Sequence, residues 1–174
     1  VLVFKGRNIH PGYAKNQMIN AAAVAARFIA SLPEAETPEH TEKREGFFHM
    51  TEFKGDENEA KVTLIIRDFE AEQNARRIEF LRRQIAAFEL RYPGLQVTPT
   101  FTEQYRNMNE VLSQHPEVVK KAEQAMAAAG ISVIRKAIRG GTDGARLCFM
   151  GLPTPNIFAG GLRFHSKTEW IPAR

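Results

Sequence analysis

Apolar residues in the first hundred positions follow two periods, and the period changes at turns rich in glycine, proline or charge. Recurrence every three or four positions predicts a helix with one buried face, and alternation of β-branched or aromatic residues with polar ones predicts a strand. The predicted elements are a strand at 1–5, a helix at 14–31, strands at 47–54 and 61–69, a helix at 71–91 and a strand at 95–102. This order is the ferredoxin-like βαββαβ pattern, a four-stranded antiparallel sheet with both helices on one face. Residues 33–45 are polar, carry two prolines and are predicted to be a surface loop.

The pattern changes after Leu112. Proline is common at the first position of a helix and glycine just after its end. The sequence therefore predicts a helix that begins at Pro116 and is ended by Gly130. A strand at 131–138, a short helix at 144–150 and a strand near 156–159 are predicted next. Alternating strands and helices are typical of α/β domains, and about 60 residues are too few to close one. We therefore predict an α+β chain, with a ferredoxin-like domain at 1–110 and part of an α/β domain at 111–174.

Composition narrows the class of protein. Apolar residues make up 43% and charged residues 25% of the chain, which is typical of a globular protein and excludes a disordered one. Basic residues exceed acidic ones by 24 − 20 = 4, without a basic block, and the helix at 71–91 interleaves arginines with glutamates. We interpret its basic face, Arg76, Arg77, Arg82 and Arg83, as solvated, and we expect no nucleic-acid partner.

No apolar run reaches the roughly 20 residues of a membrane span, so we expect no membrane partner. Cys148 is the single cysteine and has no partner for an internal disulfide, which is compatible with a cytoplasmic location. The chain starts at Val1, in what looks like the middle of a strand and without an initiator methionine. It ends as abruptly, at Arg174, so both ends are compatible with cuts in a longer polypeptide.

Candidate chemistry lies in the glycine-rich segment 138–144. Arg139 with the backbone N–H groups of Gly140 and Gly141 suits a carboxylate or a carbonyl oxyanion. The alternative is a plain strand-to-helix turn in which Thr142 or Asp143 caps the helix. The residues alone leave both interpretations open.

Two histidines likewise allow either a functional or a purely structural interpretation. His165 stands among polar residues near the C-terminus, and nothing nearby supplies a second ligand at zinc spacing, so a surface role is the alternative to a metal ligand. His10 precedes Pro11 and Gly12 and is equally suited to a local hydrogen bond in a turn.

Seven segments, taken in order, resemble those of the tripeptide aminopeptidase (peptidase T) family. They are Asn8-Ile9-His10-Pro11-Gly12-Tyr13-Ala14-Lys15, Glu45-Gly46-Phe47-Phe48-His49, Ile65-Ile66-Arg67-Asp68-Phe69, Tyr105-Arg106-Asn107-Met108, Ile138-Arg139-Gly140-Gly141-Thr142-Asp143-Gly144-Ala145, Gly151-Leu152-Pro153-Thr154-Pro155-Asn156 and Phe164-His165-Ser166-Lys167-Thr168-Glu169. They cover the chain from the first turn almost to its end.

The resemblance implies a di-zinc exopeptidase in which a ferredoxin-like lid is inserted into an α/β catalytic domain. In that family a bridging water on two zinc ions attacks the first peptide bond. His165 would be a zinc ligand, and His10 would reach from the lid to the scissile carbonyl oxygen. The peptide would contact Arg139, Gly140, Gly141, Thr142 and Asn107. The family's remaining ligands, a His-x-Asp motif and a Glu-Glu pair, are not found in this sequence, so we expect the isolated chain to hold no zinc pair and to be inactive.

Two other functions compete with a tripeptidase. One is a related hydrolase, such as a dipeptidase or an acyl-amino-acid hydrolase of the same architecture. The other is a non-catalytic ferredoxin-like module for dimerisation or binding, and a homodimer through the lid is compatible with both classes. The sequence does not reveal the substrate side chain, the oligomeric state, the physiological metal, or whether the missing N-terminal catalytic half was cut away or never present.

Overall fold

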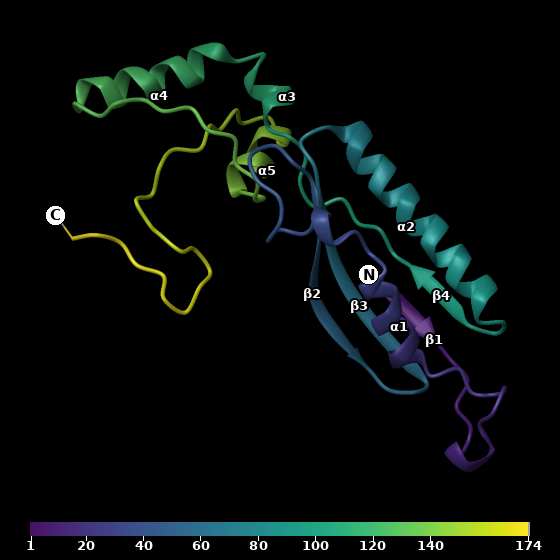
Figure 1. Cartoon of the computed structure of the whole chain (residues 1–174). Helices are drawn as coiled ribbons and strands as arrows, with labels where there is room; N and C mark the ends of the chain where they lie inside the picture. The colour runs from purple at the N-terminus through teal and green to yellow at the C-terminus, as the bar shows by residue number, and fades with distance from the viewer. Residues whose placement is uncertain (174) are drawn as a thin grey trace. The chain divides into compact units, whose positions relative to one another are not determined.

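The computed structural model describes residues 1–173, which form two compact units. Unit 1 consists of Val1–Glu103 together with Ala137–Arg139. Unit 2 consists of the remaining described residues, 104–136 and 140–173. Figure 1 shows the elements of both units along the chain.

Unit 1 contains a four-stranded antiparallel sheet. Its strands are β1 (Leu2–Lys5), β2 (Phe47–Gly55), β3 (Glu59–Arg67) and β4 (Gln96–Pro99), in the spatial order β2-β3-β1-β4. Leu2 lies between Val62 of β3 and Pro99 of β4, so the first strand occupies the middle of the sheet. This order confirms the predicted ferredoxin-like topology.

Helices α1 (Ala21–Ala30) and α2 (Ala71–Arg91) contribute to one hydrophobic core with the sheet (Figure 1). Phe28 of α1 is fully buried, with its ring centroid 5.4 Å from that of Phe4 on β1 and 5.2 Å from that of Phe88 on α2. Both aromatic pairs meet edge to face, the arrangement that aromatic rings favour. Phe28 therefore connects both helices with the central strand.

The predicted start of the first helix is wrong. α1 begins at Ala21 rather than near Ala14, because Asn20 caps it by accepting the Ala23 N–H at 2.9 Å. The backbone of Ile19 instead pairs with Arg7 in an isolated β-bridge. The 3-10 turn η1 (Pro11–Tyr13) lies between the two partners of that bridge. The other elements predicted for unit 1 are confirmed, with ends shifted by a few residues.

Unit 2 is helical in its regular parts. It contains α3 (Asn109–Leu112), α4 (Pro116–Ala128) and α5 (Asp143–Phe149). The predicted helices at 116–129 and 144–150 are confirmed, whereas the strands predicted at 131–138 and 156–159 are wrong. A strand exists only when its backbone pairs with a neighbour, and neither segment has a ladder partner among the described residues. The buried apolar side chains that unit 2 contributes are Ala145 and Cys148. Across residues 1–173, no helix has the length and apolarity required to cross a membrane.

The aromatic centre of unit 1 gives a stability prediction. Phe28→Ala removes a fully buried ring that connects both helices with β1, so the free energy of unfolding should fall by about 3–5 kcal/mol. Phe28→Leu keeps part of the volume and should lose less. Leu90→Ala, at a residue of α2 that is 83% exposed, is the matched control and should change stability by less than about 0.5 kcal/mol. Urea unfolding measures all three, and equal midpoints for Phe28→Ala and Leu90→Ala would contradict this core.

The β2–β3 turn gives a pH prediction. Backbone N–H groups of Glu59 and Asn58 donate to Asp56 and lower the pKa of its carboxyl below the ordinary 3.8. A lowered folded-state pKa contributes stability above the ordinary value and loses it as the pH falls through the lowered one. Asp56→Asn should therefore unfold at lower urea than the parent near neutral pH, and the difference should shrink below about pH 4. Glu57→Gln removes a charge from the same turn and is the control, so an identical pH profile for both variants would contradict the assignment.

Candidate functional site

Arg139 is held against the loop that precedes β2. Its Nη1 donates to the carbonyl of Thr41 at 2.6 Å, and its Nη2 donates to Thr41 Oγ1 at 2.7 Å and to the carbonyl of Glu45 at 2.9 Å. The guanidinium also lies over the ring of Phe47, 5.0 Å from its centroid. All of these acceptors are neutral, so no carboxylate compensates the positive charge of Arg139 among the described residues.

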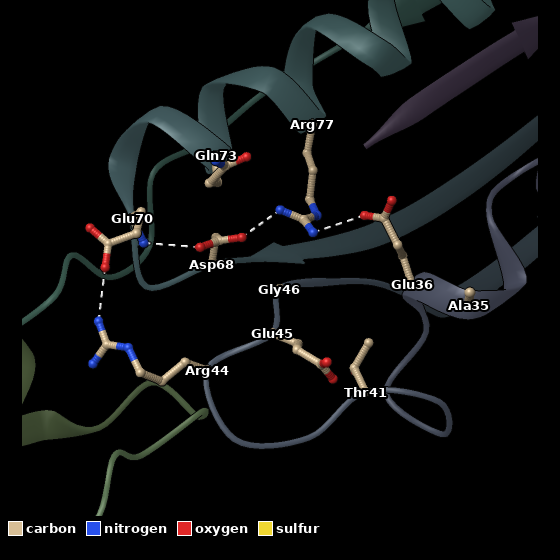
Figure 2. Close-up of a pocket in the computed structure, with 10 residues that line it drawn as sticks. All are labelled: Ala35, Glu36, Thr41, Arg44, Glu45, Gly46, Asp68, Glu70, Gln73 and Arg77. Atoms are coloured by element: carbon tan, nitrogen blue, oxygen red, sulfur yellow. Dashed lines mark hydrogen bonds and ion pairs between the residues drawn. The ribbon is translucent and has the colours of Figure 1, made fainter.

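The loop that holds Arg139 is built around a second arginine. Arg77 of α2 donates from Nη1 to Asp68 at 2.5 Å and from Nη2 to Glu36 at 2.8 Å. Asp68 follows the end of β3, and Glu36 ends the 3-10 turn η2 (Glu34–Glu36). Figure 2 shows Arg77 between the two carboxylates. The side chains of Arg77 and Asp68 are only 16% and 7% exposed, so this ion pair is largely shielded from water.

A hollow of about 460 Å³ lies beside this network (Figure 2). Its walls include Thr41, Gly46 and Gln73, together with both members of the exposed ion pair between Arg44 and Glu70 at 2.8 Å. Gly46 is required at this wall, because a Cβ there would lie 2.1 Å from Asp68 Oδ2 and 2.6 Å from the carbonyl of Arg67. The chain can approach the Arg77–Asp68 pair this closely only with a glycine.

In unit 2, Thr142 takes the structural role that the sequence left open. It is the N-cap of α5, and its Oγ1 accepts the N–H of Ala145 at 3.3 Å and an amide N–H of Asn156 at 2.9 Å. The amide of Asn156 also approaches the sulfur of Met108, at 3.8 Å. The segments around 108, 142 and 156 are thus brought together by side-chain contacts.

The two glycines that follow Arg139 differ in their surroundings. A Cβ on Gly141 would lie 2.3 Å from the ring of Tyr105, whereas one on Gly140 would meet nothing within 4 Å. Asn107, near Tyr105 in sequence, accepts the N–H of Asn109 with its side-chain oxygen at 3.0 Å, at the start of α3. Gly141 is therefore needed for packing, and Gly140 is not.

His10 is exposed and caps η1, where its Nδ1 accepts the N–H of Gly12 at 3.2 Å. The turn role expected from sequence is therefore present. Because Nδ1 is the acceptor, Nε2 carries the proton in the neutral ring and is a hydrogen-bond donor. Figure 1 places η1 at the far end of the sheet from the β2 start where Arg139 is held, so the structure does not bring His10 and Arg139 together.

His165 is exposed, has a left-handed backbone with φ of 66°, and donates its backbone N–H to Glu169 at 2.9 Å. Zinc sites need about three protein ligands besides water. Nowhere in residues 1–173 do three histidine, cysteine, aspartate or glutamate side chains gather closely enough to hold a metal ion. The residues that the structure describes do not by themselves supply the ligands of a zinc pair.

Arg77 is the site residue that the sequence analysis missed. Its interpretation as part of a solvated face holds for Arg76 and Arg83, which pair with glutamates one turn earlier at 2.7 and 3.0 Å and are exposed. It is wrong for Arg77, which is mostly buried. The available signal was spacing, because Arg77 lies four residues before the buried Leu81 and so shares its face of the helix.

The antiparallel sheet, its two covering helices and the loop packed on β3 and α2 define a ferredoxin-like α+β domain. Residues 1–93 match the family described as Peptidase dimerisation domain, which is more than half of the chain. The chain belongs to this family.

Curated relatives match over nearly the whole chain. Peptidase T of Aeromonas hydrophila is 47% identical over 169 residues, which are 97% of this chain and 42% of that protein. Peptidase T of Parabacteroides distasonis is 46% identical over 99% of this chain and 42% of its own length. The chain thus spans about 42% of the length of these relatives.

Two solved structures share the fold. They are the aminopeptidase PepT of Bacillus cereus, with a TM-score of 0.65 and 18% identity, and a tripeptidase of Staphylococcus aureus, with a TM-score of 0.63 and 19% identity. Each covers 98% of this chain and is itself covered to 45%. At this identity they support the fold alone.

The glycine at the wall of the hollow gives a prediction. Gly46→Ala forces a methyl group onto Asp68 Oδ2 and the Arg67 carbonyl, so it should destabilise unit 1 by about 1–3 kcal/mol. Gly140→Ala is the matched control, because its methyl group meets no neighbour, and it should be neutral or slightly stabilising. Urea midpoints compare the two variants. Equal stability would mean that the loop does not pack against Asp68 as described.

Proposed function

We propose that this chain is a segment of a zinc-dependent aminopeptidase that removes the N-terminal residue of tripeptides. The observation that carries the proposal is the length of the similarity to proteins named Peptidase T, which reaches 97–99% of the chain and so includes both units. A module used only for dimerisation would need similarity in unit 1 alone. The proposed location is the cytoplasm, where small peptides are available as substrates.

The charge on Arg139 favours a peptide as the ligand. A half-buried guanidinium held by two carbonyls and a hydroxyl has no carboxylate partner among the described residues. Such a group attracts a carboxylate more strongly than one already neutralised by an acid. We assign Arg139 to the charged part of a short peptide, and we also assign Gly140, Gly141, Thr142 and Asn107 to substrate binding.

His10 suits the carbonyl of the scissile bond. With Nδ1 fixed by Gly12, its exposed ring offers Nε2–H as a donor, the kind of group that stabilises a developing oxyanion. His165 is proposed as one zinc ligand in a longer protein whose other ligands lie outside these residues. Because the described residues gather no metal site, no step of hydrolysis is assigned to this chain.

Self-association is a second proposal for unit 1. Membership in the Peptidase dimerisation domain family supports it, and so does the position of β2 at the edge of the sheet, where a nine-residue strand has one side unpaired in the described structure. A homodimer formed there is compatible with the peptidase.

The test starts from the gene, whose coding sequence on both sides of this chain is read before the whole reading frame is expressed. We expect the encoded protein to release the N-terminal residue of tripeptides in a metal-dependent way. His165→Ala should lower kcat/KM by roughly 100-fold or more and reduce the zinc content. His115→Ala, at an exposed histidine paired with Glu117, is the matched control and should change neither.

Other results identify the alternatives. Turnover by the isolated chain would contradict the expectation that it is an inactive segment. Cleavage of dipeptides or acyl-amino acids in place of tripeptides would assign a related hydrolase. A reading frame confined to this chain, or a longer protein that dimerises and cleaves none of these substrates, would favour the non-catalytic module.

A further inference from the structure

We propose that Arg77 is a positioning residue for the Arg139 guanidinium, acting through the loop between η2 and β2. The inference rests on the proposed function in one respect only, namely that Arg139 contacts the peptide. The structural part, that Arg77 holds the loop and the loop holds Arg139, depends on unit 1 alone.

The first connection runs through Glu36. Arg77 binds this carboxylate at the end of η2, and the next residue, Thr37, accepts the hydroxyl of Thr41 with its carbonyl at 2.7 Å. The same hydroxyl accepts the Nη2–H of Arg139 at 2.7 Å. Each hydrogen bond orients the next, so the position of η2 sets the direction of the acceptor that Arg139 meets.

The second connection runs through Gly46. Asp68 and Arg77 together form the surface against which the backbone at Gly46 lies, with the Arg77 Cζ 2.8 Å from where a Cβ would be. The backbone carbonyl of the preceding residue, Glu45, accepts from Arg139, and its side-chain carboxylate accepts the N–H of Glu42 at 2.8 Å. The positions of both sets of Arg139 acceptors, at Thr41 and at Glu45, therefore depend on contacts that Arg77 makes.

An arginine is required at position 77. Its planar fork reaches two carboxylates at once, whereas a lysine is a single point charge on a flexible stem. Both partners belong to segments far apart in sequence, at 36 and 68, and Figure 2 shows them on opposite sides of the guanidinium. Loss of one of the two ion pairs of Arg77 would release one end of the loop and leave the other end in place.

The first test needs no activity. In the isolated chain, the Arg139 Nε–H resonance is assigned by its loss in Arg139→Lys, and loop amides are followed by hydrogen exchange. Glu36→Gln changes a side chain that is 41% exposed. It weakens the Arg77–Glu36 ion pair and leaves no fully buried charge without a partner. It should shift that resonance and speed exchange at 37–46. Arg76→Met, which breaks an exposed pair on the same helix, is the matched control and should do neither. An unmoved Arg139 resonance in both Glu36→Gln and Arg77→Met would overturn the proposal.

The second test uses the whole encoded protein. Arg77→Met should raise KM for a tripeptide by roughly tenfold with kcat within about twofold, because Arg77 acts on binding through Arg139. Glu36→Gln should do the same to a smaller extent, and serves if Arg77→Met fails to fold. In the Arg139→Lys background, Arg77→Met should add little, since both changes affect one group.

The outcomes separate the two proposals. If the fold-changes in KM of Arg77→Met and Arg139→Lys multiply in the double variant, the role of Arg77 is overturned. A fall in kcat with unchanged KM would overturn it as well. A protein that cleaves no tripeptide would overturn the proposed function, while the resonance and exchange measurements would still decide whether Arg77 positions Arg139.

Discussion

The long polar loop between α1 and β2 depends on two guanidinium groups. Residues 33–46 supply no side chain to the buried core, so hydrophobic burial does not order them. Arg77 fixes both ends of the loop through Glu36 and the surface beside Gly46, and Arg139 satisfies the carbonyls of Thr41 and Glu45. Taking a charged group out of water is costly unless it is paired, and Arg77 meets that requirement with two carboxylates. Removing Glu36 or Asp68 would leave the largely buried charge of Arg77 incompletely compensated. Ion pairs and hydrogen bonds, rather than hydrophobic burial, therefore hold the loop against the sheet and α2.

The ferredoxin-like core makes this arrangement possible, because it fixes where β3 ends and α2 begins. Asp68 lies at that junction, where one carboxylate oxygen accepts the N–H of Glu70 at 2.9 Å and the other takes Arg77. Arg77 follows within the first two turns of α2, on the same face as the buried Leu81. The apolar face of the helix therefore turns Arg77 inward, and the core determines the geometry of a polar network that it does not contain.

Periodicity predicted the elements whose residues alternate or repeat against a single core, which is why the sheet, α2 and α4 were found. It failed where a hydrogen bond decided the outcome. Asn20 starts α1 seven residues later than the apolar pattern suggested, and the segment at 131–138 has strand-forming residues but pairs with no strand within residues 1–173. Arg77 was missed because its charge was counted with those of its exposed neighbours, although its spacing from Leu81 placed it on the buried face. Contacts between residues distant in sequence, such as Arg139 with Thr41, have no local signal at all.

The glycine-rich segment shows why a motif needs a structure before it is assigned a function. Gly141 is explained by the ring of Tyr105, Gly144 by the carbonyl of Thr154 at 2.9 Å from a Cβ, and Thr142 by its cap on α5. Packing and capping thus account for these residues without any ligand. Arg139 differs from them. A neutral donor would satisfy two carbonyls and a hydroxyl as well, and Arg77 shows that this chain can neutralise a guanidinium with carboxylates where only anchoring is needed. The positive charge of Arg139 lies over the ring of Phe47 and beside neutral acceptors, without a carboxylate partner among the described residues, and this is the property on which the proposed contact with a peptide carboxylate rests.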